Sequence, residues 1–265
     1  MAPAAEISKP LASRLLLGAV DIAAKLNRRS AVLGDPDVYD NAAFPWANQL
    51  STRWQVIRAE LDHVLERRAE ISPVQEIIAG AGSITDDAGW KIFVLVAHGV
   101  PSPPNIASCP ETWRLVRQIP GLRSAMFSIF EPGKRLAPHC GPYNGILRLH
   151  LGLLVPTPEH TGIRIGSQTR SWKEGEVLIF DDAHEHAAWN DSAELRVVLF
   201  VDFLKPLRFP ASLVNRLLLR LAMFSPYVRE GKESLRRWEQ RFWQSRSSTY
   251  PQASTPPGSP GQQRE

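Results

Sequence analysis

The chain has few cysteines and no long apolar segment. Cys109 and Cys140 are its two cysteines in 265 residues, too few for a disulfide framework, and neither has the Cys-x-x-Cys spacing of a zinc site. We therefore expect a reducing compartment. No stretch approaches the ~20 apolar residues that span a bilayer. A secretory pattern is also missing, because Asp21 interrupts the short apolar run at residues 15–20, so we expect a cytoplasmic protein that is soluble or peripheral on a membrane.

The charge pattern does not indicate a nucleic-acid-binding protein. The formal net charge is +4 and the sequence pI is near 9.3. No basic cluster is interleaved with aromatic residues in a recognisable binding module, so we expect no nucleic-acid partner. With 43% hydrophobic and 22% charged residues, the chain is long enough for one well-buried domain and short for two.

The apolar periodicity changes from helical to strand-like near residue 91. Before it, residues 11–29 and 48–68 have the 3.6-residue pattern of amphipathic helices. After it, short apolar runs separated by Gly, Pro, Asn and Asp predict a strand-rich barrel or sandwich. The predicted strands are residues 92–97, 125–130, 146–155, 177–180 and 195–203, and further helices are predicted at 111–118, 213–228 and 234–243.

His139 lies close to a strand that carries charged residues. In the predicted strand 146–155 the side chains of Arg148 and His150 share one face, and the leucines between them share the other. We interpret the leucine face as packed against helices and the polar face as lining a cavity. Ser128 is likewise the polar member of its strand face. This pattern predicts a barrel interior built around a metal.

His186 stands in a similar relation to Arg196. A turn of three or five residues near Asn190 would place Arg196 directly across a hairpin from His186, whereas a turn of four residues would not. The first arrangement brings a fork-shaped guanidinium close to a metal ligand. It suits a co-substrate with two carboxylates, one on the metal and the other on the arginine.

Several short motifs follow one another between residues 128 and 206. They are Pro-His139-Cys-Gly-Pro, Leu-Arg148-Leu-His150-Leu-Gly-Leu, Trp172-Lys-Glu-Gly-Glu, Phe180-Asp-Asp, Glu185-His186 and Arg196. In this order they resemble the aspartyl/asparaginyl β-hydroxylase family of iron(II)- and 2-oxoglutarate-dependent dioxygenases. The resemblance covers about a third of the chain.

The resemblance implies a mainly β fold with flanking helices, namely a double-stranded β-helix (jelly-roll, cupin-like) barrel. It also implies a hydroxylase that uses iron(II), 2-oxoglutarate and O2. The implied roles are metal binding for His139 and His186, 2-oxoglutarate binding for Arg196, His150 and Ser128, and substrate binding for Arg148.

The expected domain organisation follows from the periodicity and the resemblance together. We expect an N-terminal helical region at residues 1–85, the double-stranded β-helix domain at 86–206 and C-terminal helices at 207–245. Residues 246–265 are rich in Pro and Ser and cannot bury enough apolar surface to offset the entropy of ordering. We therefore expect this tail to be disordered.

Gly141 bears on the substrate. Most oxygenases of this fold have a His-x-Asp/Glu motif, which provides two histidines and one carboxylate, and Gly141 stands where that carboxylate would be, as in the animal peptidyl hydroxylases of the family. The bacterial lipid A acyl hydroxylases of the same family are also similar around Pro142 and Tyr143, but resemble the type that carries the carboxylate. We therefore favour the β-carbon of Asp or Asn in a peptide or amino acid as the hydroxylated position, with a lipid acyl chain as the alternative.

Two other classes of protein stay open. His184 shares a strand face with His186, so His139, His184 and His186 could form the three-histidine site of a cupin-like zinc hydrolase. A catalytically silent ligand-binding barrel is the other alternative.

Two charged features have two interpretations each. A buried Arg148 without an anionic partner would be costly, so the substrate would bring a carboxylate or phosphate, unless Arg148 pairs with Asp181, Asp182 or Glu185. The hydrophobic, basic segment 213–221 either packs against the barrel or rests on an anionic membrane together with the N-terminal helix.

Overall fold

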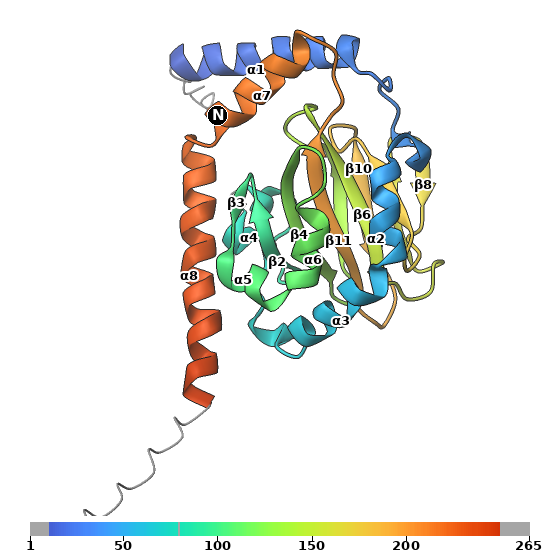
Figure 1. The fold of residues 1–265 in the computed structure, drawn as a ribbon, viewed down its shortest axis with the longest axis vertical. Helices are drawn as coiled ribbons and strands as arrows, with labels where there is room; N and C mark the ends of the chain where they lie inside the picture. Colours follow the sequence, from blue (N-terminus) through green and yellow to red (C-terminus); the bar gives the residue numbers. More distant parts are fainter. Residues whose placement is uncertain (1–10, 79, 250–265) are drawn as a thin grey trace, which may run out of the picture.

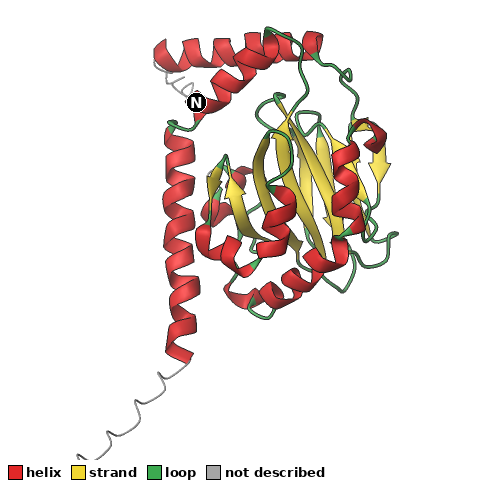
Figure 2. Cartoon of the chain, viewed as in Figure 1, coloured by secondary structure: helices red, strands yellow, loops and turns green. Residues whose placement is uncertain are grey.

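Helices surround a β-rich centre (Figures 1 and 2). The structure is a computed structural model that describes residues 11–78 and 80–249. Within these residues no helix combines the length and apolar character needed to cross a bilayer. The α-helices are α1 (Leu11–Ser30), α2 (Asn48–Thr52), α3 (Trp54–Leu65), α4 (Val74–Ile77), α5 (Pro103–Ser108), α6 (Pro110–Val116), α7 (Ala211–Ala222) and α8 (Pro226–Thr249).

The strands form two antiparallel sheets. The larger sheet has the order β1-β9-β6-β11-β4-β2-β3 and the smaller has the order β5-β10-β7-β8. From β4 to β11 the chain passes back and forth between the sheets, which is the topology of a jelly roll. The predicted fold, a double-stranded β-helix with flanking helices, is therefore confirmed. The strands are β1 (Val38–Tyr39), β2 (Trp90–Ala97), β3 (Val100–Pro101), β4 (Leu122–Phe130), β5 (Arg135–His139), β6 (Ile146–Leu154), β7 (Thr161–Ile165), β8 (Gln168–Arg170), β9 (Val177–Phe180), β10 (His186–Asn190) and β11 (Arg196–Leu204).

Strand β6 has the two faces that its alternating sequence predicts. Its leucines lie in the main hydrophobic core, where Leu149 and Leu151 are fully buried. That core also contains Ile57 and Leu61 from α3 and Trp238 from α8. The opposite face of β6 looks toward the smaller sheet, so the space between the sheets holds polar side chains.

The C-terminal helices differ from their prediction. The helix predicted at residues 213–228 ends at Ala222, and a second helix begins at Pro226. Proline has no N–H and disfavours helical backbone in the residue before it, but it fits the first turn of a new helix. Helix α8 then continues to Thr249, beyond the predicted start of the tail at residue 246. The rest of the predicted tail, residues 250–265, lies outside the described residues.

The predicted hairpin between His186 and Arg196 is wrong. Strand β10 pairs with β5 and β7 in the smaller sheet, whereas β11 pairs with β4 and β6 in the larger sheet. The chain crosses from one sheet to the other between Asn190 and Arg196. His186 and Arg196 therefore reach the same interior from different sheets.

Candidate active site

A cavity between the two sheets contains every site residue predicted from the sequence. The larger sheet contributes Arg196, and the smaller sheet contributes His139 and His186. Aromatic side chains form much of the cavity wall, so the lining is mainly apolar with a few polar groups that point inward. Its lining residues are Trp90, Ser128, Phe130, Leu136, His139, Arg148, His150, Ile163, Trp172, Phe180, His186, Ala188, Arg196 and Phe200.

His139 and His186 face each other across neighbouring strands. The two residues are direct cross-strand partners in the β5–β10 pair, and such partners point to the same face of a sheet. Their ring centroids are 4.2 Å apart. Antiparallel pairing thus brings together two imidazoles that are 47 positions apart in the sequence.

Backbone hydrogen bonds orient both rings. The Nδ1 atom of His139 lies 2.8 Å from the carbonyl oxygen of Ala137, and that of His186 lies 2.9 Å from the carbonyl oxygen of His184. Each bond requires the proton on Nδ1 and leaves the Nε2 lone pair free, as in metal-binding histidines. Burial lowers the pKa of both groups, that of His186 to about 3. The pair is therefore neutral, the form that binds metal.

Arg196 is a buried cation without a counter-charge among the described residues. Its side chain is 1% exposed, and its guanidinium lies 3.6 Å from the ring centroid of Phe130 and 4.5 Å from that of Trp172. None of the carboxylates among residues 11–78 and 80–249 pairs with it. Its Nε has no hydrogen-bond partner there, and burial lowers its pKa to about 9. An anionic ligand would compensate this charge.

His150 offers a second unused donor to the same space. Its Nδ1 accepts a hydrogen bond of 3.3 Å from Trp172 Nε1, so the proton is on Nε2. That atom is buried and has no partner among the described residues. Burial, followed by the charges of Arg148 and Arg196, places the pKa of His150 well below its usual value. The ring is thus a neutral donor.

Ser128 lies beside this donor pair. Its hydroxyl oxygen accepts a hydrogen bond of 3.0 Å from Trp90 Nε1, which leaves the hydroxyl proton available to a ligand. Its carbonyl oxygen lies 3.5 Å from Arg196 Nη1. The cavity end that contains Ser128, His150 and Arg196 therefore presents donors and a positive charge.

Arg148 already has anionic partners within the chain. Its Nη2 lies 2.8 Å from Asp182 Oδ2, its Nε lies 2.9 Å from Asp202 Oδ1, and the guanidinium lies over the Phe200 ring at 4.1 Å. The prediction that the substrate must bring an anion to an unpaired Arg148 is therefore wrong. The alternative, a buried ion pair with Asp182, is what the structure contains, together with a second pair to Asp202.

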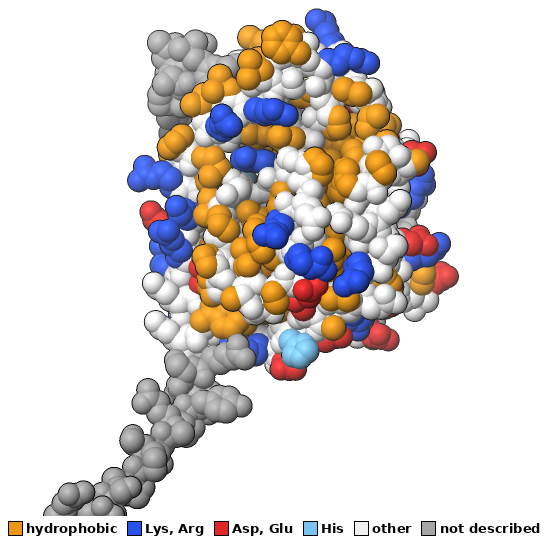
Figure 3. Space-filling model, viewed as in Figure 1, with side chains coloured by type: hydrophobic (Ala, Val, Ile, Leu, Met, Phe, Trp, Pro, Cys, Tyr) orange, Lys and Arg blue, Asp and Glu red, His pale blue; other side chains and the backbone are white. Residues whose placement is uncertain are grey.

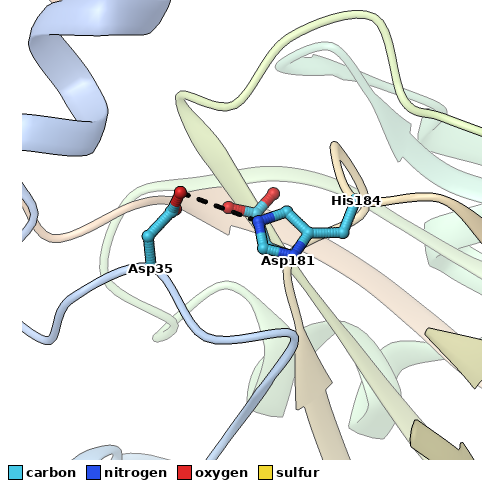
Figure 4. Close-up of side chains that lie close together, drawn as sticks. All are labelled: Asp35, Asp181 and His184. Carbon is cyan, nitrogen blue, oxygen red and sulfur yellow. Dashed lines mark ion pairs between the residues drawn. The ribbon is translucent and has the colours of Figure 1, made fainter. Parts of the chain in front are cut away.

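His184 does not join the other two histidines. Its Nδ1 lies 2.5 Å from Asp37 Oδ1, and its Nε2 lies 3.7 Å from Asp35 Oδ2. The three-histidine arrangement considered from the sequence is thus not formed. The position of His184 among carboxylates is drawn in Figure 4.

The cluster of Asp35, Asp181 and His184 has donor atoms close enough to hold a cation (Figure 4). Lys205 already neutralises part of its negative charge, because Lys205 Nζ lies 2.6 Å from Asp181 Oδ2 and also bonds the Asp35 carboxylate. The Lys205 side chain is 1% exposed. We interpret the cluster as an ion-pair network that ties the segment before β1 to the barrel.

Two contributors to the site were not identified from the sequence. Asp202 is the direct cross-strand partner of Arg148 in the β6–β11 pair. Trp90 lies on β2 and donates to Ser128. The signal for Asp202 was present, since it is the one carboxylate in a strand that is apolar after Arg196. Its strand partner, however, depends on the register between two distant segments.

Comparison with known proteins identifies the family to which the chain belongs. The family model described as Aspartyl/Asparaginyl beta-hydroxylase matches residues 51–206, more than half of the chain. The chain belongs to this family. The match begins before residue 86, where we expected the barrel domain to start.

Two curated relatives of the chain are named for hydroxylation of different substrates, a lipid acyl chain and aspartyl or asparaginyl residues. The "Ornithine lipid ester-linked acyl 2-hydroxylase" of Rhizobium tropici is 50% identical over 241 residues, which cover 90% of this chain and 86% of the relative. The human "Aspartyl/asparaginyl beta-hydroxylase" is 34% identical over 163 residues, which cover 59% of this chain and 21% of the human protein. Membership of the family, together with these relatives, supports hydroxylase activity.

Among solved structures, a Pseudomonas putida prolyl-4-hydroxylase is similar at 16% identity and a TM-score of 0.38, over 58% of this chain and 88% of that one. A likeness at this level carries no argument about function. The fold assignment depends on the strand order instead.

Proposed function

We propose that this protein is an iron(II)- and 2-oxoglutarate-dependent hydroxylase that acts on the acyl chain of an amino-acid-containing lipid. The observation that supports the co-substrate is the buried Arg196 guanidinium, which has no carboxylate partner in the part of the chain that the structure describes. 2-Oxoglutarate has a carboxylate at each end. An arginine fork suits the distal one through two charge-assisted hydrogen bonds.

The donor set of the site fits both groups. His139 and His186 offer two neutral imidazole nitrogens, ligands that suit iron. The free donors of His150 and Ser128 lie beside Arg196 and suit a carboxylate. Iron with 2-oxoglutarate would supply the oxidising power for hydroxylation of an unactivated C–H bond with O2. The protein's part is to bind and orient the reactants and exclude water.

The substrate class is supported by the extent of the similarity. The relative named for a lipid acyl 2-hydroxylase is similar over nine tenths of this chain, including the helical regions outside the barrel. The relative named for Asp or Asn β-hydroxylation covers little more than half of it. The substrate favoured from the sequence, an Asp or Asn residue, is the second candidate. The family match and the human relative support it.

The internal ion pairs of Arg148 also bear on this choice. Because Asp182 and Asp202 already neutralise its guanidinium, the substrate need not carry an anion to this position. An acyl chain can therefore lie in the aromatic part of the cavity without leaving a charge unpaired. This removes the main sequence-based argument against a lipid.

Product analysis tests the proposal. Purified protein is incubated with iron(II), 2-oxoglutarate and O2 and either a detergent-dispersed ornithine lipid or an Asp-containing peptide. We expect succinate release stimulated by the lipid and a lipid product one oxygen atom heavier. His186→Ala should abolish both signals, whereas His63→Ala, at an exposed histidine of α3, should leave them unchanged. Product from the peptide alone would favour the second candidate. A lack of succinate with every substrate would contradict the co-substrate assignment.

A further inference from the structure

Helix α7 exposes a row of large apolar side chains. Leu213, Leu217 and Leu221 are each more than half exposed, and their spacing of four residues places them along one side of the helix. Phe209 before the helix and Phe224 after it are both 79% exposed. Together with Ile22 of α1, these side chains form what we call the α1–α7 face. An exposed apolar surface of this kind marks an interaction site.

The same face is basic. Residues 206–229 contain four arginines and no Asp or Glu. Arg216 and Arg220 are exposed on α7 next to the leucine row, and no carboxylate of the described chain forms an ion pair with either. Figure 3 shows hydrophobic and basic side chains intermixed over α1 and α7. The described part of α1 adds the exposed cations Lys25, Arg28 and Arg29.

An open groove between α7 and α8 continues this face. Its cationic lining is Arg220, Arg229 and Lys232, and Met223, Phe224 and Val228 supply its apolar lining. Cations beside apolar side chains suit a surface on which phosphate groups lie next to hydrocarbon. The leucine row and the groove therefore point to the same chemistry.

The α1–α7 face lies at the metal-ligand end of the barrel. Strand β5 ends at His139 and β6 begins at Ile146, so residues 140–145 lie at one end of the sheets. Leu204, the last residue of β11, pairs with Ile146, and the chain leads from there into α7. α1 and α7 cap this end in Figure 1.

Buried and partly buried hydrogen bonds connect the face to the loop that follows His139. Asn27 of α1 donates to the Tyr143 hydroxyl at 2.9 Å, and Asn144 donates to the Ala24 carbonyl oxygen at 2.9 Å. Asn215 of α7 donates to the Gly145 carbonyl oxygen at 2.7 Å. The two helices are thus held in a defined position relative to the candidate active site.

We propose that the α1–α7 face binds the surface of an anionic lipid bilayer and brings the metal-ligand end of the barrel to the membrane. A second copy of the chain fits less well, because a symmetric contact would bring the arginines of both copies together. The role of the α1–α7 face in bringing an acyl chain to the cavity rests on the lipid hydroxylase function proposed above.

Vesicle flotation tests the contact itself. We expect the protein to float with vesicles of mixed phosphatidylcholine and phosphatidylglycerol, to float poorly with phosphatidylcholine alone, and to be released by salt. Arg216→Glu/Arg220→Glu should reduce binding at least about tenfold. Arg53→Glu/Arg117→Glu makes the same change in net charge at exposed positions outside the face and should bind as the unchanged protein does. Leu217→Ser/Leu221→Ser should weaken the part of vesicle binding that salt does not release, because that part depends on buried apolar side chains.

Activity separates this proposal from the proposed function. The Arg216→Glu/Arg220→Glu variant should lose hydroxylation of vesicle-embedded ornithine lipid and retain hydroxylation of the detergent-dispersed lipid. Flotation without any lipid hydroxylation would support the docking face and refute the lipid substrate. Hydroxylation of the lipid without flotation would support the lipid substrate and refute the docking face. Equal flotation of the Arg216→Glu/Arg220→Glu variant and the unchanged protein would overturn the docking proposal. So would a dimer in solution that dissociates in this variant or in Leu217→Ser/Leu221→Ser.

Discussion

The carboxylate of Asp182 fills the space that a side chain at position 141 would need. A Cβ atom on Gly141 would lie 2.3 Å from Asp182 Oδ2, and the Gly141 N–H also donates to the Asp182 carbonyl oxygen. The glycine at the expected carboxylate position thus permits a buried Asp182 to reach Arg148. The position is closed by packing, so a carboxylate introduced there cannot simply join the two histidines.

Gly141→Ala should therefore destabilise the protein and disturb the cavity. The new methyl group must displace Asp182 and break its ion pair with Arg148, and overpacking of this kind costs about 1–3 kcal/mol. Urea denaturation and succinate release measure the two effects. Gly82→Ala, with no atom within 4 Å of the added Cβ, should change stability by less than about 0.5 kcal/mol.

A double variant identifies the cause. If the clash with Asp182 is responsible, Gly141→Ala combined with Asp182→Ala should cost less than the sum of the single changes. Strict additivity would show that the two residues do not compete for space. Gly141→Asp should lose activity for the same reason as Gly141→Ala, and full activity with tighter iron binding would contradict the packing argument.

Changes at Arg196 should separate co-substrate binding from stability. Arg196→Lys should raise the KM for 2-oxoglutarate at least about tenfold, or ~1.4 kcal/mol, because an ammonium cannot reproduce the two-pronged bond. Steady-state kinetics with varied 2-oxoglutarate measures this. An unchanged KM would refute the assignment.

Arg196→Met should stabilise the protein in the absence of the co-substrate, although it should also abolish co-substrate binding. Removal of a buried, unpaired charge should raise the free energy of unfolding by roughly 1–4 kcal/mol, the gain seen when buried ionic groups give way to packed apolar ones. Thermal unfolding should show a higher Tm that 2-oxoglutarate no longer raises. Arg53→Met, at an exposed arginine, should change neither the Tm nor its response to 2-oxoglutarate.

The histidines should differ in their effect on metal binding. His186→Ala should abolish iron(II) binding, measured anaerobically by calorimetry, because it removes one of two nitrogen donors. His184→Ala should retain most of it, because His184 bonds Asp37 and lies away from the pair. Equal losses would favour the three-histidine site.

The Lys205 network should make stability depend on pH. Burial opposes the charged form of Asp35, but the bond to Lys205 and its charge outweigh this and lower the Asp35 pKa below 3.8. A carboxyl with a depressed pKa stabilises the fold above its unfolded value, and this contribution is lost as the pH falls. We expect the free energy of unfolding to fall on acidification below about pH 4.

Asp35→Asn tests that dependence. The variant should be less stable near neutral pH and should lose part of the acid-dependent slope in urea denaturation measured across this range. Asp86→Asn, at an exposed carboxyl, should follow the unchanged protein. An identical slope in both variants would show that the Asp35–Lys205 pair contributes nothing.

Local periodicity was enough to predict the five central strands of the larger sheet, but not its short edge strands β1 and β3 or the smaller sheet. Strands β4, β6 and β11 bury at least one complete face, so apolar residues recur at every second position and the strands can be read from the chain. β5 and β10 are short, and β5 exposes several positions. Their pattern is weak, which is why the His186–Arg196 hairpin was expected in place of a crossing between sheets.

The sequence by itself determined which side chains reach the interior. Alternation places Arg148 and His150 opposite the leucines of β6 whatever the strand pairs with, because successive side chains point to opposite faces. The order of the motifs around His139, His186 and Arg196 determined the family.

Only the tertiary structure decided which of these side chains meet. Register and sheet order join residues that are far apart in the chain, and a shift of one residue would move a side chain to the other face. They pair His139 with His186, join Arg148 to Asp182 and Asp202, and leave Arg196 without a counter-ion among the described residues. Long-range packing also turned His184 toward Asp37 and left Leu213, Leu217 and Leu221 of α7 at the surface.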